Sequence, residues 1–97
     1  MELIDLHLLI RGRVQGVGFR DSLVGQARRA GVAGWVRNRG YDAVEAVLRG
    51  PPQAVESVAA WAAVGPRSAR VERVDRRPPT PAERSEIDAG FARLPSV

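Results

Sequence analysis

An α+β fold is predicted for this 97-residue chain, with two helices on one face of a mainly antiparallel sheet of four or five strands. Side chains alternate between two faces over residues 3–10, as in a strand with one buried face. Apolar residues recur at helical spacing over residues 19–30 and 55–62. Two strand-like runs, 32–37 and 42–49, flank a polar turn, which is typical of a hairpin.

The first strand and the first helix each have one apolar face. The strand is expected to direct Ile4, Leu6, Leu8 and Ile10 toward the core. The helix is expected over residues 19–30 and to end at Gly31, after two arginines that suit a helix C-terminus. Its apolar face consists of Phe19, Leu23, Ala27 and Ala30.

The second half of the chain repeats the strand and helix patterns. Val44, Ala46 and Leu48 are expected on the core face of the hairpin. Pro51 and Pro52 suit the first turn of a second helix, and Gly65–Pro66 ends it. A fourth strand follows over residues 69–76, then a polar, proline-rich loop over 77–88 and a short last strand over 88–94.

The resulting order is βαββαβ with an added edge strand. Because parallel βαβ crossovers are right-handed, two interleaved units of this kind form a split-βαβ sandwich with both helices on one sheet face. The length favours a single domain over residues 1–97, with one modest core.

Composition excludes several kinds of chemistry. The chain has no cysteine, which excludes disulfides, thiolate metal sites and cysteine nucleophiles. All 15 basic residues are arginine, so a lysine-dependent P-loop or Schiff base is also excluded. The N-terminus has neither a basic start nor a long apolar run, and we therefore expect a cytoplasmic protein without a membrane segment.

A glycine loop (residues 12–20, Gly-Arg-Val-Gln-Gly-Val-Gly-Phe-Arg) lies between the first strand and the first helix. Gly12, Gly16 and Gly18 allow positive φ, so that backbone N–H groups can converge on one point. The N-terminus of the following helix adds unpaired donors and partial positive charge. This arrangement predicts an anion site of the size of a phosphoryl group.

The glycine loop is followed by further segments that together resemble the acylphosphatase family. These are Gly34-Trp-Val-Arg-Asn38, Val44-Glu45 and Gly65-Pro66, with Ala69 and Val71 after them. The resemblance covers nearly the whole chain, and the glycine loop and Gly34–Asn38 are specific as a pair. It implies a small ferredoxin-like enzyme that hydrolyses acyl phosphates to a carboxylate and inorganic phosphate without a metal or cofactor.

Roles for individual residues follow from the resemblance. It implies that Arg20 grips the phosphate and that Asn38 orients the attacking water. The cradle of backbone N–H groups would come from Gln15, Gly16, Val17, Gly18, Phe19 and Arg20. The implied partner is a small-molecule acyl phosphate bound by a monomer, with no nucleic acid and no membrane.

These residue types suit the implied reaction. A guanidinium binds two phosphate oxygens and stays charged at any working pH. A carboxamide both donates and accepts, so Asn38 can hold a water without taking its proton. The leaving carboxylate has a conjugate-acid pKa of about 4, so no general acid is needed. We therefore expect alkyl phosphomonoesters to react far more slowly.

Two functions of other classes remain open at this stage. An RNA-binding module of this fold would stack bases on aromatic residues of the central strands, but the open-face positions, such as Asp5, His7 and Glu45, contain none. A non-catalytic domain that binds a phosphorylated ligand would keep the loop, yet the presence of both Arg20 and Asn38 argues against it. The resemblance also extends to a domain of a larger carbamoyl-transfer maturation protein for hydrogenases, although the chain's own Met1 favours the stand-alone enzyme.

Several residues have plainer structural interpretations. His7 is placed in mid-strand on the face away from the core, where one histidine without cysteine cannot build a typical zinc site. Asp5 and Glu45 are interpreted as charges on the sheet surface that pair across strands. Packing roles are expected for Trp35, Trp61 and Phe91, and an exposed position for Tyr41. The family usually has an Asp-Gly turn where this chain has Tyr41-Asp42 after Gly40, so we expect a different turn type at the same length.

Overall fold

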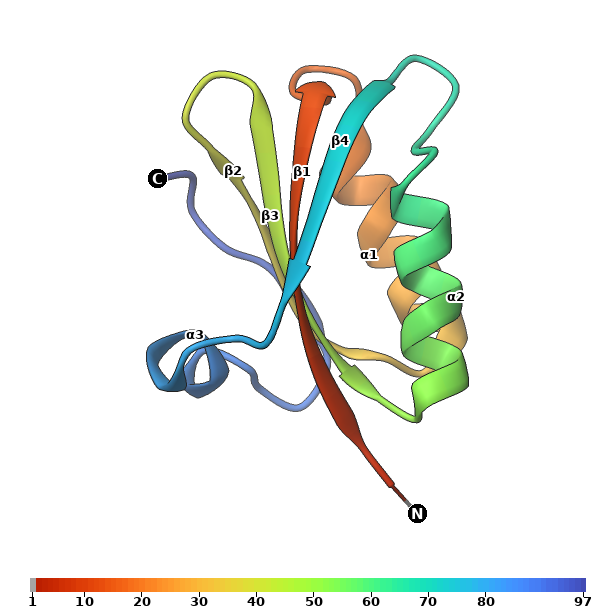
Figure 1. The fold of residues 1–97 in the computed structure, drawn as a ribbon, viewed down its shortest axis with the longest axis vertical. Coiled ribbons are helices and arrows are strands. Elements are labelled where there is room, and N and C mark those ends of the chain that lie inside the picture. Colours follow the sequence, from red (N-terminus) through yellow and green to blue (C-terminus); the bar gives the residue numbers. More distant parts are fainter. Residues whose placement is uncertain (1) are drawn as a thin grey trace.

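A computed structural model describes residues 2–97 and contains a sheet with two long helices on one of its faces (Figure 1). The predicted α+β, ferredoxin-like arrangement is confirmed. Along the chain the elements are β1 (Ile4–Arg13), α1 (Phe19–Ala30), β2 (Ala33–Arg39), β3 (Ala43–Gly50), α2 (Pro52–Ala62), β4 (Arg70–Arg77), α3 (Pro81–Ser85) and β5 (Phe91–Arg93).

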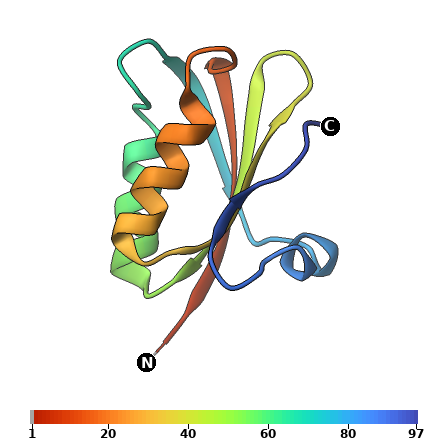
Figure 2. The same cartoon turned by 180° about the vertical axis from the view of Figure 1, so that it is seen from behind.

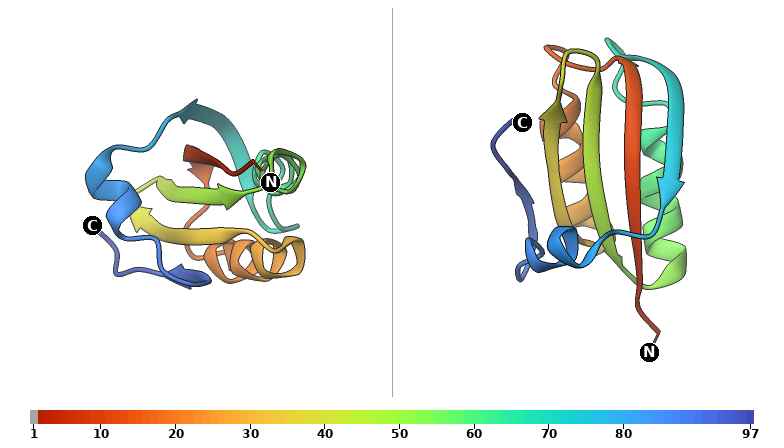
Figure 3. Two further views of the ribbon diagram at one scale, coloured as in Figure 1. Left: turned by 90° about the horizontal axis from the view of Figure 1, so that it is seen from below. Right: turned by 60° about the vertical axis from the view of Figure 1, so that its left-hand side comes forward.

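The five strands are arranged in the order β4-β1-β3-β2-β5. Neighbouring strands are antiparallel except β2 and β5, which are parallel. The right-hand view of Figure 3 shows β1 and β3 in the middle of the sheet with α1 and α2 behind them. We call the side covered by these helices the helix face and the opposite side the open face.

The core lies between the sheet and the two helices, as the alternation predicts. Leu8 lies opposite Ala46 and Ile10 opposite Val44 in the β1–β3 register, and all four are buried. They pack with Phe19, Leu23 and Ala27 of α1 and with Val55, Val58 and Ala62 of α2. Beside the start of α1 the ring of Trp61 lies 5.5 Å from that of Phe19. Trp35 and Phe91 are buried, so the packing roles predicted for Trp35, Trp61 and Phe91 are confirmed.

Glycines delimit α1 at both ends. Gly18 precedes the helix with a φ of 77°, and Gly31 follows it with a φ of 73°. The N–H of Gly31 donates to the carbonyls of Ala27 and Arg28, which closes the C-terminus. Among residues 2–97, no side chain caps the N-terminus of α1, so its first N–H groups are left for another acceptor.

The proline-rich segment departs from the sequence prediction. Residues 77–88 were expected to form only a loop, but Pro81–Ser85 forms the short helix α3. Thr80 accepts a hydrogen bond from the backbone N–H of Glu83, whose side chain accepts from the N–H of Thr80. This capping box, with proline in the first turn, starts a helix where the number of prolines suggested a loop. The last strand, β5, is shorter than predicted and includes only Phe91–Arg93.

The C-terminal residues continue along β2. The N–H of Leu94 donates to Val36, and the N–H of Val97 donates to the carbonyl of Asn38. The N–H of Gly40 donates in turn to Val97. Figure 2 shows this segment running beside the last part of β2 toward the β2–β3 turn.

The α-helices over residues 2–97 are all too short or too polar to cross a membrane.

Candidate active site

The glycine loop and the β2–β3 turn lie at the same end of the sheet (Figures 1 and 2). Gly16 and Gly18 have φ angles of 73° and 77°, which confirms the predicted left-handed conformation. A Cβ placed on either would meet no atom within 4 Å. These two glycines are therefore required by backbone conformation, and the space beside them is open to a ligand.

Arg20 lies in the first turn of α1, directly after the buried Phe19. The ring of Phe19 fixes this end of the helix because it packs closely against Trp61 and Gly65. Arg20 itself is half-buried. Its position next to the uncapped helix N-terminus combines a guanidinium with free backbone donors and the positive end of the helix dipole.

Asn38 lies near the end of β2, opposite Val44 of β3. Because side chains alternate along a strand, Asn38 shares the helix face with Val36, while Arg37 points to the open face, where it contacts Glu45. The Oδ1 atom of Asn38 is buried and has no hydrogen-bond partner among residues 2–97. An acceptor in this state is suited to a water or ligand donor.

Direct hydrogen bonds connect the glycine loop to the β2–β3 turn. The N–H of Gly12 donates to the carbonyl of Asp42 at 3.0 Å. The side-chain amide of Gln15 donates to the carbonyls of Gly40 and Ala43 at 3.0 and 2.8 Å. Sequence reasoning assigned Gln15 only a backbone donor, because its side-chain contact depends on how a turn distant in sequence folds back.

The β2–β3 turn consists of Gly40, Tyr41 and Asp42. Gly40 takes the left-handed conformation with a φ of 63°, and Tyr41 at the tip is 98% exposed. The structure thus brings the predicted loop, the start of α1 and the end of β2 to one end of the helix face.

Comparison with known proteins identifies the family. The family model described as acylphosphatase matches residues 6–92 of the chain. The chain belongs to the acylphosphatase family. The resemblance inferred from the sequence is thereby confirmed, and the protein is a hydrolase.

Several relatives support this membership. The acylphosphatase of Thiobacillus denitrificans is 59% identical over 70 residues, which cover 72% of this chain and 79% of that protein. The acylphosphatase of Nitrobacter hamburgensis is 44% identical over 99 residues and matches along the full length of both chains. Among solved structures, an acylphosphatase from Coxiella burnetii superposes with a TM-score of 0.82 at 26% identity, covering 95% of this chain and 93% of that one.

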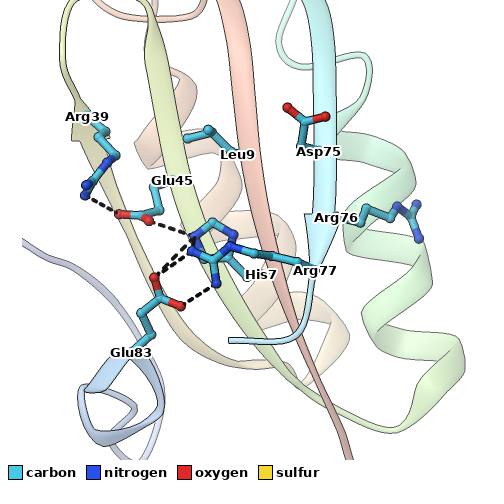
Figure 4. Close-up of a pocket in the computed structure, with 8 residues that line it drawn as sticks. All are labelled: His7, Leu9, Arg39, Glu45, Asp75, Arg76, Arg77 and Glu83. Carbon is cyan, nitrogen blue, oxygen red and sulfur yellow. Dashed lines mark hydrogen bonds and ion pairs between the residues drawn. The ribbon is translucent and has the colours of Figure 1, made fainter. Parts of the chain in front are cut away.

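A pocket of about 250 Å³ lies on the open face, away from the glycine loop (Figure 4). His7 and Glu45 are 1% and 2% exposed at its base, so interpreting Glu45 as a surface charge was wrong. The reason is α3, which brings Glu83 to within 3.7 Å of His7 and covers this part of the sheet. The predicted pairing of Glu45 across strands is confirmed, because His7 Nε2 of β1 lies 2.7 Å from Glu45 Oε2.

Arginines neutralise the carboxylates of this pocket. Arg37 donates to Glu45 at 2.8 Å, and Arg77 donates to both carboxylate oxygens of Glu83 at 2.8 Å. Burial alone raises the pKa of Glu45, but the hydrogen bonds from His7 and Arg37 outweigh it and leave the pKa lowered. The hydrogen bonds from Arg77 lower the pKa of Glu83 to about 2.

This cluster contains atoms of the kind that bind metal ions, but an arginine side chain competes with a metal ion for them. Oxygen and nitrogen atoms of His7, Glu45 and Glu83 lie within 4.8 Å of one another. The guanidinium of Arg77 already occupies Glu83 and lies 3.2 Å from His7 Nε2. The cluster is therefore an ion-pair network that joins α3 to the sheet, and the glycine-loop end of the molecule is the candidate active site.

Proposed function

We propose that this protein hydrolyses acyl phosphates at the glycine-loop end of the helix face, with Arg20 holding the phosphoryl group and Asn38 orienting the attacking water. Acylphosphatase activity follows from membership of the family. The assignment of residues rests on one observation above others. The buried Oδ1 of Asn38, which has no partner among residues 2–97, belongs to the end of β2 that the glycine loop contacts through Gln15.

Phosphate binding draws on two kinds of donor. The proposed cradle consists of the backbone N–H groups of residues 15–20, where Gly16 and Gly18 have positive φ, and the uncapped start of α1 extends the set. Arg20 adds a charge-assisted, two-pronged contact. In phosphoryl transfer, negative charge accumulates on the equatorial oxygens, and each donor aimed at them contributes about 3–4 kcal/mol by analogy with oxyanion holes.

The reaction needs only a positioned water. The oxygen of the water forms a bond to phosphorus while the bond between phosphorus and the acyl oxygen breaks, and the electron pair leaves on the carboxylate. Asn38 accepts a hydrogen bond from the water through Oδ1, which is free for this purpose. The proton of the water passes to a phosphate oxygen. Because the leaving carboxylate is weakly basic, with a conjugate-acid pKa of about 4, no residue has to protonate it.

We propose further that the enzyme acts as a single-domain monomer in the cytoplasm on a small-molecule acyl phosphate, without metal, cofactor or nucleic acid. The open face supports the last point. In the described part of the chain, its central positions include His7, Leu9 and Glu45. Trp35 of the neighbouring strand β2 is fully buried and donates its N–H to the carbonyl of Glu83. Bases would find no exposed ring there to stack on.

Hydrolysis of benzoyl phosphate in the presence of a chelator tests the proposal. We expect Arg20→Ala and Asn38→Ala each to lower kcat by about 100-fold or more while both variants stay folded. Arg20→Lys should remain strongly impaired, because an ammonium keeps the charge but not the two-pronged geometry. Arg29→Ala, which changes an exposed arginine in the last turn of the same helix, is the matched control and should stay fully active.

The opposite results are equally informative. Activity that disappears with the chelator and returns with a divalent ion would contradict the metal-free mechanism. A folded but inert wild type would favour a phosphate-binding role instead. Rapid turnover of an alkyl phosphomonoester would contradict the argument from the leaving group.

A further inference from the structure

One side chain bridges the two parts of the candidate active site. Gln15 Nε2 donates to the carbonyl oxygens of Ala43 at 2.8 Å, Gly40 at 3.0 Å and Arg39 at 3.4 Å. A carboxamide has two N–H protons, so the two short contacts use both and the third contact shares one of them. These are the side-chain hydrogen bonds of Gln15 within residues 2–97, and all of them reach the β2–β3 turn.

The bridge connects segments that must keep their spacing. Gln15 directly precedes Gly16 in the glycine loop, and Arg39 directly follows Asn38 in β2. The turn offers its carbonyl groups at both ends, since Arg39 and Ala43 form the last pair of the β2–β3 ladder. The amide of Gln15 thus holds the segment after Asn38 at a fixed distance from the loop that would bind phosphate.

We propose that Gln15 is a positioning residue, whose side chain sets the distance between the phosphate-binding loop and Asn38. The inference rests on the proposed function of these two groups. An attacking atom has to lie about 3–3.5 Å from the reacting centre, and a displacement of about 1 Å can cost about 100-fold in rate. Removing the bridge should therefore lower kcat through Asn38, with little effect on phosphate affinity.

Kinetic coupling to Asn38 is the first test. Wild type, Gln15→Met, Asn38→Ala and the double variant are compared with benzoyl phosphate, and inorganic phosphate serves as a competitive inhibitor. Gln15→Met keeps the length of the side chain and removes its donors. We expect its kcat to fall about 10- to 100-fold, with KM and the inhibition constant of phosphate within about twofold. The double variant should match Asn38→Ala within about threefold, because the effect acts through Asn38.

Gln26→Met is the matched control. Gln26 lies in the middle of α1 and is half-buried like Gln15. Since it is remote from the β2–β3 turn, this variant should keep the wild-type kcat.

Asn38 also permits a direct spectroscopic test, because it is the only asparagine of the chain. Protein labelled with ¹⁵N only at asparagine gives a single pair of side-chain amide resonances. We expect Gln15→Met to shift or broaden this pair and Gln26→Met to leave it unchanged.

If Gln15→Met does not fold, Gln15→Glu replaces it. The introduced carboxylate cannot donate a hydrogen bond when ionised. The kcat of this variant relative to wild type should therefore rise as the pH falls and the carboxyl group becomes protonated.

Failure of the bridge and failure of the proposed function give different results. If Asn38→Ala is impaired but Gln15→Met keeps the wild-type kcat, or if the two losses multiply in the double variant, Gln15 does not act through Asn38 and this inference is overturned. A change in phosphate affinity at unchanged kcat overturns it as well. If Asn38→Ala is fully active, the proposed function itself fails and the positioning role fails with it.

Discussion

At the residue scale, Asn38 is unusual because it is placed where it weakens the fold. Its Oδ1 is buried without a partner among residues 2–97, whereas buried polar atoms are nearly always hydrogen-bonded. An unsatisfied buried acceptor costs about 1–3 kcal/mol. A catalytic group that is free to bind water explains why such a cost persists at this position.

Replacing Asn38 should therefore lower the activity without lowering the stability of the fold. We expect Asn38→Ala to keep the wild-type free energy of unfolding or to raise it by up to about 2 kcal/mol, because the orphaned carbonyl is removed. Urea denaturation of both proteins measures this difference. A loss of stability of more than about 1 kcal/mol would indicate that the Asn38 side chain makes a stabilising bond in the folded protein.

Some residues of the candidate site could be placed from the sequence, and the contacts of others could not. Arg20 was placed at the helix start because a strand, a glycine loop and an apolar helix follow each other locally. The burial of His7 and Glu45 was missed because the residue that covers them, Glu83, comes from a helix far away in sequence. The bridge of Gln15 was missed for the same reason, since its acceptors belong to the turn at residues 39–43.

At the element scale, prediction succeeded where a local signal delimits the element. Glycines end α1, prolines start α2, and alternation defines the core faces of β1 and β3. The helix α3 was overlooked because its five residues are too few for an apolar period, and the prolines around it are typical of a loop. The local signs are the capping pair of Thr80 and Glu83 and the proline in the first turn.

The pairing of β2 with β3 depends on a glycine that local patterns cannot explain. Gly34 has a φ of 140°, and a Cβ at this position would lie 1.8 Å from the carbonyl oxygen of Val47. Strain and overlap with rigid backbone both oppose any side chain there. The strand that carries Asn38 therefore requires glycine at its start.

Substitution of this glycine should be severe. We expect Gly34→Ala to lower the free energy of unfolding by about 3 kcal/mol or more, since backbone strain and overpacking each cost about 1–3 kcal/mol. Gly40→Ala is the matched control, because Gly40 also has a positive φ of 63° but open space around its Cβ position. It should lose only about 1–2 kcal/mol. Equal losses in the two variants, measured by urea denaturation, would show that the contact with Val47 is relieved by a small shift of the strands.

At the scale of the whole molecule, ion pairs connect the open face of the sheet to the segment that covers it. Arg49 and Arg84 both donate to Asp5, which joins β3 and α3 to the first strand. Hydrogen bonds from Arg49 lower the pKa of Asp5 against the opposing effect of burial. Together with the pair of Arg77 and Glu83, these contacts attach α3 to the sheet.

The charge state of Glu83 should make this attachment sensitive to acid. Its pKa is lowered from the ordinary value of 4.5 to about 2 in the folded protein, chiefly by Arg77. The unfolded chain therefore binds a proton before the folded protein does, so the stabilisation is complete above about pH 4.5 and is lost as the pH falls toward 2. Asp5 and Glu45, whose pKa values are also lowered, add losses of the same sign.

Glu83→Gln isolates this contribution, because glutamine can still complete the capping box. We expect the variant to be less stable than wild type at pH 7 and the difference between them to shrink as the pH falls from about 4.5 to 2. Glu72→Gln, at an exposed position of β4, is the control and should follow the wild type at every pH. Free energies of unfolding from urea titrations between pH 2 and 7 measure the difference. If it stays constant over this range, the carboxylate of Glu83 does not stabilise the fold through its charge, and the packing of its side chain would account for the loss.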